Sequence, residues 1–404
     1  MDSIAVSDAG MLAAGGNAGL SLWPLDAPRA LATTVGSLGY ANEEAPVEIW
    51  GLAVGSSGEV AAATNRGVLL WRDPAADAAR VPQTPTIISG DDSLAVAFHG
   101  DTLASAHSGS ITLWNAASCD RSGKLATDCL LGSVNAGSRH DIYSLTFDGT
   151  GDLVAAGTFD GRVMVWDVTN PRKPKPKGVL LKEPNAIYSL AFSPTDDLLA
   201  VAGKDGTIQL WSVPGTGKPM RVQVLRGPHG DQAVDSLVFS PDGTLLASGG
   251  DDQQVILWHV DPTNGLTRVR SATQTGSNSI LAVAFSPGDG ATLATGDDNG
   301  RACLYDTGSL QPLGSSDCLL GHSAAHASRT GLWGVAFTLD GQALLTGGID
   351  NPVVAWSSVL WSNSRKDIDA AYCTFALPPL SESQWSSAFY GTPLAHRAST
   401  TRCR

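Results

Sequence analysis

Long apolar runs are missing from this sequence. None approaches the ~18–20 residues that a membrane-spanning helix needs. The first residues, MDSIAVSDAGMLAAGG, lack the basic stretch and apolar core of a signal peptide. Lys and Arg are scarce beside Asp and Glu, 26 against 39, and the net charge is −13. Because phosphates and anionic lipid surfaces attract cationic proteins, we expect neither a nucleic-acid partner nor a membrane partner.

The common catalytic and cofactor motifs are also missing. GTGKP at 215–219 fails as a phosphate-binding loop because Pro219 stands where Ser or Thr is needed, and no H-E-x-x-H or G-x-S-x-G occurs. GDDNG at 296–300 lacks the ligand spacing of a calcium loop and is typical of a hairpin turn. We therefore expect no enzyme activity, no catalytic residue, no metal site and no cofactor.

The six cysteines form no C-x-x-C pair. In a chain of this size they predict mainly buried thiols in a reducing compartment, and hence a cytoplasmic protein. Two pairings stay open, Cys119 with Cys129 and Cys373 with Cys403.

What the sequence does contain is repetition. FSPTDDLLAVAGKDGTIQLW ends at Trp211, and the similar FSPDGTLLASGGDDQQVILW ends at Trp258. Such a period indicates a repeat architecture, which suits 404 residues better than one compact core does. Eight copies align on a closing aromatic residue: Trp23, Trp71, Trp114, Trp166, Trp211, Trp258, Tyr305 and Trp356.

Each copy carries three short apolar runs and a weaker fourth. In the fifth copy these are AIYSLAF, LLAVAG, TIQLW and MRVQVL, separated by turn residues such as KDG. Short apolar runs bounded by Pro, Asp and Gly indicate strands, and Asp-Gly favours a tight hairpin. We therefore expect an all-β single β-propeller of eight four-stranded antiparallel blades, or seven with one copy displaced. Small residues such as Ala62, Ala63 and Gly249 in the second run would let tapered blades pack closely.

These repeats resemble the WD-repeat β-propeller family, on FSPDG at 239–243, LASGGDD at 246–252, VILWHV at 255–260, DGRVMVWDV at 160–168 and LLGHS at 319–323. The resemblance implies a hydrogen-bonded set of His, Ser or Thr, Asp and Trp within a blade. Two copies offer the whole set: His229, Ser248, Asp252 and Trp258; His322, Thr346, Asp350 and Trp356. The same residue types could form a hydrolase triad, but a set that recurs in two copies favours a structural role.

The propeller is predicted to span residues 1–361, followed by a tail at 362–404 with two short helices packed on it. No segment precedes the first copy to complete the last blade. Either that blade has three strands, or the tail supplies its edge, or Met1 opens a piece of a longer protein. The ending from Leu380 to Cys403 resembles bacterial WD-repeat proteins in which the propeller follows an ATPase, caspase-like, kinase or TIR effector, which implies a sensor domain.

The resemblance also implies that ligands meet the narrow mouth of the ring. Equivalent positions there are rich in aromatic and acidic residues, as binding hot spots are: Trp50, Tyr143, Tyr188, Asp235 and Trp333 in the first run, and Phe159, Lys204, Asp251 and Asp298 in a nearby turn. The alternative is that Tyr143 and Tyr188 only pack between blades.

These residues favour a non-enzymatic protein–protein interaction platform that binds a protein or peptide partner, or an effector domain or chain. The alternatives are a propeller enzyme with acidic residues at the channel mouth and an architectural subunit of a larger complex. NPRKPKPKGVLLK at 170–182 is basic and Pro-rich, which predicts a solvated extended loop that could dock an acidic partner.

Overall fold

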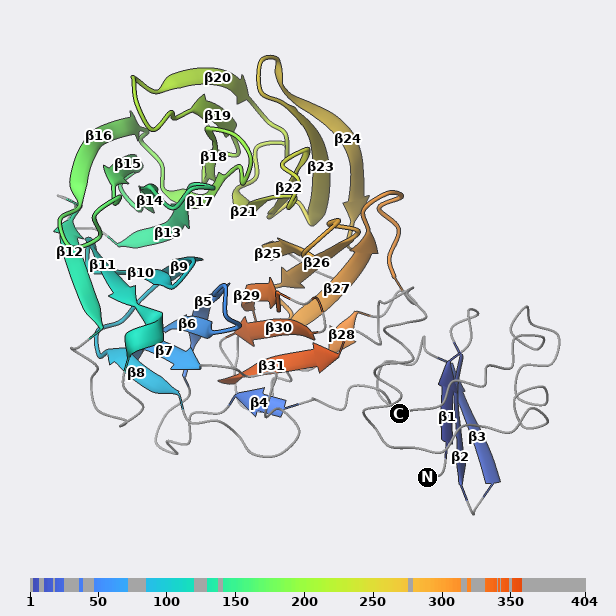
Figure 1. The fold of residues 1–404 in the computed structure, drawn as a ribbon. Coiled ribbons are helices and arrows are strands. Elements are labelled where there is room, and N and C mark those ends of the chain that lie inside the picture. Colours follow the sequence, from blue (N-terminus) through green and yellow to red (C-terminus); the bar gives the residue numbers. More distant parts are fainter. Residues whose placement is uncertain are drawn as a thin grey trace.

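The chain folds as a seven-bladed β-propeller (Figure 1). The structure is a computed structural model. It describes the backbone of four short segments, 3–6, 11–16, 19–24 and 36–38, and residues 47–71, 85–119, 129–136, 141–274, 279–313, 318–320, 331–339, 341, 343–348 and 351–357. In each blade four antiparallel strands run in order, with the first strand nearest the centre of the ring and the fourth at its periphery.

Six blades are built from four consecutive strands each. Blade 1 comprises β5 (Ile49–Val54), β6 (Val60–Thr64), β7 (Gly67–Trp71) and β8 (Thr86–Ser89). Blade 2 comprises β9 (Ala95–His99), β10 (Thr102–His107), β11 (Ser110–Asn115) and β12 (Leu130–Asn135), with the short 3-10 helix η1 (Ala116–Ser118) after β11. Blade 3 comprises β13 (Ile142–Phe147), β14 (Leu153–Thr158), β15 (Arg162–Asp167) and β16 (Lys175–Lys182).

The next three blades continue this pattern. Blade 4 comprises β17 (Ile187–Phe192), β18 (Leu198–Gly203), β19 (Ile208–Ser212) and β20 (Met220–Leu225). Blade 5 comprises β21 (Val234–Phe239), β22 (Leu245–Gly250), β23 (Gln254–Asp261) and β24 (Gly265–Thr273). Blade 6 comprises β25 (Ile280–Phe285), β26 (Thr292–Asp297), β27 (Arg301–Asp306) and β28 (Leu319–Leu320).

Blade 7 joins the two ends of the ring. Its inner strands are β29 (Leu332–Phe337), β30 (Ala343–Gly348) and β31 (Asn351–Ser357), and its outer strand is β4 (Gly36–Leu38) from near the start of the chain. β31 and β4 pair antiparallel, with Val354 opposite Ser37. The ring is thus closed by a strand that precedes blade 1 in the sequence, and not by the tail or by a three-stranded blade.

The prediction of eight blades is wrong, and the seven-bladed alternative is right. The first copy forms a separate three-stranded sheet of β1 (Ser3–Val6), β2 (Met11–Gly16) and β3 (Gly19–Pro24), drawn outside the ring (Figure 1). The physical reason is that blades 7 and 1 already pack directly on each other. A side chain on Gly347 of β30 would collide with Ile49 of β5, its Cβ lying 2.7 Å from Ile49 Cγ2, so no gap is left for another sheet.

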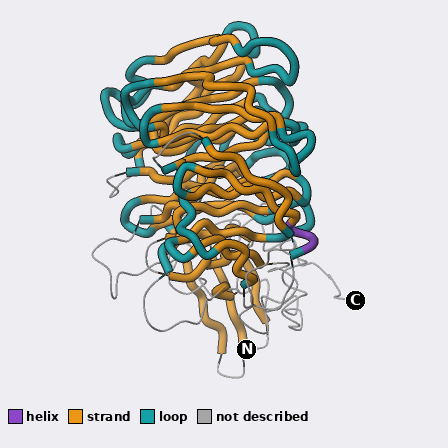
Figure 2. Tube along the Cα trace, turned by 90° about the vertical axis from the view of Figure 1, so that its left-hand side faces the viewer, coloured by secondary structure: helices purple, strands orange, loops and turns teal. Residues whose placement is uncertain are grey.

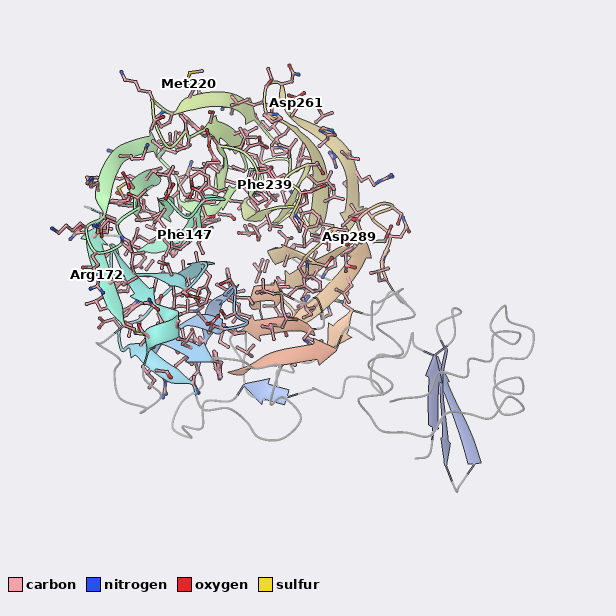
Figure 3. The ribbon with its side chains drawn as sticks, in the orientation of Figure 1. Phe147, Arg172, Met220, Phe239, Asp261 and Asp289 are labelled. Carbon is pink, nitrogen blue, oxygen red and sulfur yellow. A yellow bond between two sulfur atoms is a disulfide. The ribbon has the colours of Figure 1, made fainter. Side chains whose placement is uncertain are left out.

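Apolar contact between neighbouring blades forms the core. The second strands are almost wholly buried and rich in small residues, as in β14 (LVAAGT), which lets the next blade approach closely. One apolar cluster joins blades 2 and 3 and another joins blades 4 and 5, and the stacked sheets present their loops on both faces of the ring (Figure 2). Phe147 and Phe239 lie within this filled interior (Figure 3). Each blade is therefore stabilised mainly by its neighbours.

A serine in the first strand links consecutive blades by a repeated hydrogen bond. Ser144 Oγ accepts from the amide of Leu190 at 2.9 Å, and the hydroxyl of Ser189 accepts from the amide of Leu237 at the same distance. Ser236 of blade 5 does the same for Val283 of blade 6 at 3.1 Å. The inner strands of blades 3 to 6 are thus held in register across the blade boundaries.

Two disulfides correct the prediction of buried thiols. Cys119 pairs with Cys129 in blade 2, one of the pairings left open, and Cys303 pairs with Cys318 in blade 6. Each joins the third strand, or the turn after it, to the residue before the outer strand. Cys373 and Cys403 lie outside the described residues.

The basic Pro-rich segment also differs from its prediction as a loop. Residues 175–182 form β16, the outer strand of blade 3, because this segment can pair with β15 once two register shifts accommodate it. The two predicted tail helices and the boundary at 361/362 lie outside the described residues. Within those residues η1 is the only helix.

Candidate functional site at the mouth of the ring

The first strand of six of the seven blades contains a β-bulge at the same position. In β13, for example, Ile142 pairs with Thr158 and Ser144 pairs with Gly157, which leaves Tyr143 as the extra residue. A bulge bends the strand and redirects the side chain of the extra residue. The six residues at the bulge positions are Trp50, Tyr143, Tyr188, Asp235, Leu281 and Trp333.

All five first-strand residues predicted for the mouth are therefore bulge residues. Blade 2 is the exception: β9 pairs continuously with β10 from Ala95 onward, and Leu94 precedes the strand. The sequence alignment found these positions from the spacing of the copies, but it carried no signal for the bulge itself.

The predicted turn residues lie at the same end of the blades. The amide of Phe159 donates to the carbonyl of Asp141 at 3.0 Å, two residues before the bulge at Tyr143. The amides of three further turn residues make the equivalent hydrogen bond in the next three blades: Lys204 to Ala186, Asp251 to Ala233 and Asp298 to Ser279. The structure thus brings both predicted sets to one face of the ring.

Three aromatic side chains from blades 3 and 4 touch one another at this face. The rings of Tyr143 and Phe159 meet edge-on with centroids 5.8 Å apart, and Tyr143 lies 6.0 Å from Tyr188. Phe159 is 50% exposed, while the two tyrosines are half-buried. The burial of the tyrosines fits the alternative, packing between blades, while Phe159 leaves half of its surface exposed beside Tyr143.

Two carboxyl groups of blade 5 continue this cluster. Burial, and then the negative charge of Asp251, raise the pKa of Asp235 from 3.8 to about 8. Asp235 Oδ2 is buried and has no hydrogen-bond partner among the described residues, so Asp251 acts on it mainly through its charge. The hydroxyl of Ser279, from the approach to blade 6, donates to Asp251 Oδ1 at 2.7 Å. Asp251 itself is exposed.

Burial also raises the pKa of the Tyr188 phenol, and the charge of Asp235 adds to this effect. The tyrosine and the acid pair therefore form one electrostatically connected group. We call Tyr143, Phe159, Tyr188, Asp235 and Asp251 the mouth cluster.

The other predicted mouth residues lie at equivalent positions on other blades. Trp333 in β29 is 41% exposed, and Trp50 in the adjacent β5 is half-buried. Lys204 is exposed in the turn of blade 4, and Asp298 is half-buried in the turn of blade 6. These four share the face of the mouth cluster, but they are not members of it.

The hydrogen-bonded set predicted for the sixth copy is assembled in blade 5. His229 Nδ1 lies 2.7 Å from Asp252 Oδ1 and its Nε2 lies 2.8 Å from Ser248 Oγ, while Trp258 Nε1 donates to the same hydroxyl at 3.0 Å. His229 is 1% exposed and Ser248 is fully buried, so no substrate could reach the hydroxyl. This arrangement connects strands and has no access for chemistry.

In blade 7 the structure describes only half of the predicted set. Trp356 Nε1 donates to Thr346 Oγ1 at 2.9 Å, and His322 and Asp350 lie outside the described residues. In blade 2, Trp114 Nε1 donates to Ser105 Oγ at 2.8 Å. The alignment missed this bond because Ser105 lies nine residues before its tryptophan, whereas Ser248 lies ten residues before Trp258.

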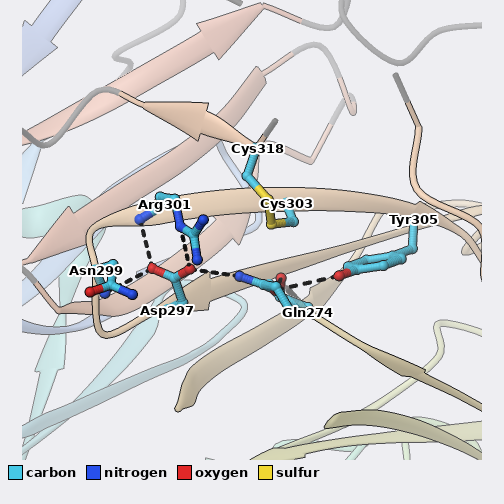
Figure 4. Close-up of a disulfide and its surroundings, with 8 residues drawn as sticks. Gln274, Asp297, Asn299, Arg301, Cys303, Tyr305 and Cys318 are labelled. Carbon is cyan, nitrogen blue, oxygen red and sulfur yellow. Dashed lines mark hydrogen bonds and ion pairs between the residues drawn. A yellow bond between two sulfur atoms is a disulfide. The ribbon is translucent and has the colours of Figure 1, made fainter. Parts of the chain in front are cut away.

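Blade 6 holds a variant network that the sequence analysis also missed (Figure 4). Gln274 takes the place of the histidine: its Nε2 donates to Asp297 Oδ2 at 2.7 Å, and its Oε1 accepts from Thr295 Oγ1 at 2.7 Å. Arg301 Nε also donates to Asp297, at 2.9 Å, and Tyr305 OH reaches Gln274 at 3.4 Å. In the alignment of the copies Asn299 occupies the position of Asp252, but the carboxylate that forms this network belongs to Asp297, two residues earlier.

No three His, Cys, Asp or Glu side chains in the described part of the chain are placed to bind one metal ion. No helix in that part could span a bilayer.

Comparison with known proteins agrees with this architecture. Three segments, 131–167, 175–212 and 219–259, match the family model described as "WD domain, G-beta repeat" (WD40). Each match begins at the outer strand of one blade and continues through the first three strands of the next, which are those of blades 3, 4 and 5. No curated protein matches the chain.

Proposed function

Because this chain carries WD40 repeats on a closed β-propeller, and such propellers generally act as protein-interaction scaffolds, we propose that it is a non-enzymatic recognition platform that binds a protein or peptide at the mouth of the ring. The observation that carries the proposal is the series of six bulges. A bulge leaves backbone groups of the strand pair without hydrogen bonds, yet six blades keep one at the position predicted for the mouth.

The chemistry of the mouth supports a protein ligand. Aromatic side chains offer large contact area with little loss of side-chain entropy, and charged groups around them set the orientation of the partner. Phe159 and Trp333 are both exposed at 41–50%. Asp251 and Asp298 place negative charge on the side of blades 5 and 6, while Lys204 supplies one cation on blade 4. A segment that combines an apolar side chain with a cation suits this surface best.

The finer proposal is that the partner is an effector domain or chain of a bacterial signalling or defence system, for which the propeller serves as sensor. Its support is the ending from Leu380 to Cys403, which resembles the ends of bacterial WD-repeat sensors. A cytoplasmic location stays a prediction, and the two disulfides weigh against it because stable disulfides are rare in reducing compartments.

The enzyme alternative has one specific observation in its favour. Asp235, with its raised pKa of about 8, stands beside the exposed Asp251, and carboxyl pairs whose pKa values are pushed apart serve as acid and base in many enzymes. The cluster also carries the half-exposed aromatic surface of Phe159, which suits recognition, so recognition remains the better account. The architectural alternative predicts that native mass measurement never finds the chain alone.

The test removes the aromatic surface from the mouth. Partners are captured from the native cell lysate and identified, and their binding to the purified chain is then measured. We expect the double variant Tyr188→Ala with Trp333→Ala to weaken that binding at least about tenfold while the circular dichroism of the ring is retained.

A matched control is available just beyond the same strand. Leu339 follows β29 at the end opposite to Trp333 and is 49% exposed. We expect Leu339→Ala to leave binding unchanged. Equal binding by wild type and the double variant would remove the mouth as the site, whatever partner is found.

A further inference from the structure

The outer strands of blades 3, 4 and 5 form a basic surface on an acidic protein. Ten of the chain's 26 Lys and Arg residues lie in the segments 172–182, 218–226 and 268–270, which contain no Asp or Glu. Nine of the ten are exposed. We call this surface the basic rim: Arg172, Lys173, Lys175, Lys177, Lys182, Lys218, Arg221, Arg226, Arg268 and Arg270.

The basic rim is continuous across the blade boundaries. Lys177 Nζ of β16 donates to the carbonyl oxygens of Pro214 and Gly215 in the turn before β20. The Gln223 side chain of β20 pairs with the backbone of Leu266 in β24, its Oε1 accepting from the amide at 2.6 Å. The three outer strands therefore lie side by side along the circumference, where Figure 3 places Arg172 and Met220.

No carboxylate in the described part of the chain forms an ion pair with a cation of the basic rim. The arginines that do form ion pairs, Arg162 and Arg301, lie within blades and not on the outer strands. Asp167 and Asp306 feel rim cations only at longer range, since their hydrogen bonds go to their own turns. Asp261 is likewise engaged within its own turn. Among the described residues, the rim charge is thus not neutralised by ion pairs.

Each of the three strands also exposes one large apolar side chain among its cations. Val179 is 57% exposed, Met220 is 69% exposed and Val269 is 48% exposed. An exposed apolar side chain gains free energy only if a partner covers it, and each of the three neighbouring outer strands carries one, at a different register position. Cations beside apolar side chains fit a peptide segment in which acidic and apolar residues alternate.

The backbone of these strands offers a third kind of contact. β16, β20 and β24 are the last strands of their sheets and pair with another strand on one side only. β24 is the longest, with nine residues and no proline. A free strand edge can accept an extended segment by backbone hydrogen bonding.

We propose that the basic rim, centred on β20 and β24, is a second docking surface, and that it binds an acidic extended segment of a partner protein. Without the ten rim cations, the net charge of the chain is more negative than −13, and this charge repels a large polyanion. A nucleic acid or an anionic membrane is therefore disfavoured. A short acidic segment can lie along the rim without approaching the acidic faces. This surface is independent of the mouth.

The probe is a fluorescent peptide of nine residues, the length of β24, with alternating Glu and Val. Binding is measured by fluorescence anisotropy on the full chain. We expect the triple variant Lys218→Gln, Arg268→Gln, Arg270→Gln to bind about tenfold more weakly. We also expect binding to weaken when ionic strength rises from about 0.1 to 1 M, since screening shortens from ~10 to ~3 Å.

Two controls distinguish the basic rim from the mouth and from nonspecific electrostatic attraction. Lys204→Gln removes an exposed cation at the mouth and should leave peptide binding unchanged. A Lys–Val peptide of the same length suits the acidic mouth instead, so the triple variant should leave its binding unchanged. The proposal is overturned if the triple variant binds the Glu–Val peptide like wild type, if it weakens the binding of both peptides equally, or if single-stranded DNA or phosphatidylserine vesicles bind where the Glu–Val peptide does not.

One further outcome concerns the strand edges. Lys and Pro on edge strands can serve only to keep sheets from pairing with each other. In that case the triple variant self-associates in sedimentation velocity while its peptide binding is unchanged, and the proposal fails.

Discussion

Replacing Ser248 with alanine removes one hydroxyl group that two buried side chains use at once. Trp258 donates to it at 3.0 Å and His229 Nε2 lies 2.8 Å from it. The site is closed to water, because Ser248 is fully buried and His229 is 1% exposed. Alanine fills the space of the serine Cβ but offers no partner, so both ring nitrogens lose a hydrogen bond inside the protein.

The expected cost follows from these contacts. A buried polar group left without a partner costs about 1–3 kcal/mol, and His229 keeps its contact with Asp252. We therefore expect Ser248→Ala to lower the free energy of unfolding by about 2–4 kcal/mol. The control is Ser271→Ala on the exposed face of β24, for which we expect less than about 0.5 kcal/mol.

Hydrogen exchange of the amides in blade 5 is the appropriate assay, since a chain of stacked blades can open locally before it unfolds as a whole. A double-mutant cycle with Trp258→Phe adds a second measurement: with the indole N–H already gone, Ser248→Ala should cost about 1 kcal/mol less. Equal exchange in Ser248→Ala and Ser271→Ala, or strict additivity in the cycle, would refute the reasoning.

Three further predictions concern blades 5, 4 and 6. The pKa of Asp235 is raised from 3.8 to about 8, so the folded state keeps a proton that the unfolded state has lost, and the free energy of unfolding should fall as pH rises through this range. Asp235→Asn should flatten that fall in thermal unfolding across pH, and an unchanged profile would contradict the burial argument. In blade 4 the buried Trp211 Nε1 has no partner among the described residues, and Val201 stands where blade 5 has Ser248. Val201→Thr should therefore raise the free energy of unfolding, measured by denaturant titration, by about 1 kcal/mol. A decrease would show that the indole does not reach the new hydroxyl. The paired variant Cys303→Ser with Cys318→Ser should cost about 3 kcal/mol and speed exchange first in β28, whereas a uniform change over all blades would count against a local tie.

Local patterns in the sequence were sufficient to predict the strands of the ring. The turns Asp-Gly and the apolar runs act over a few residues, so each hairpin can be predicted from its own residues. The spacing of Ser248, Asp252 and Trp258 likewise follows from one hairpin, which pairs Leu246 with Trp258 and Ser248 with Ile256 and leaves Asp252 in the turn. The mouth positions could be aligned for the same reason, because the period carries every blade to the same register.

Other features depend on which distant segments meet. Asp297 stands two residues from the aligned position, and only the folded blade shows that Gln274 and Arg301 converge on its carboxylate. Cys303 finds Cys318 because β28 returns beside β27. The basic segment at 170–182 resembled a loop by composition, yet pairing with β15 made residues 175–182 a strand.

By itself, the sequence determined that this protein is a ring of repeated four-stranded sheets with an aromatic and acidic mouth, because hairpins and periodicity are encoded over short distances. Only the tertiary structure decided that the ring has seven blades, since eight similar copies compete and the contact of Gly347 with Ile49 closes the circle without the first. It also decided that β4 completes blade 7 and that the first-strand residues predicted for the mouth occupy β-bulges. These outcomes depend on pairing between segments far apart in the chain, which no local pattern records.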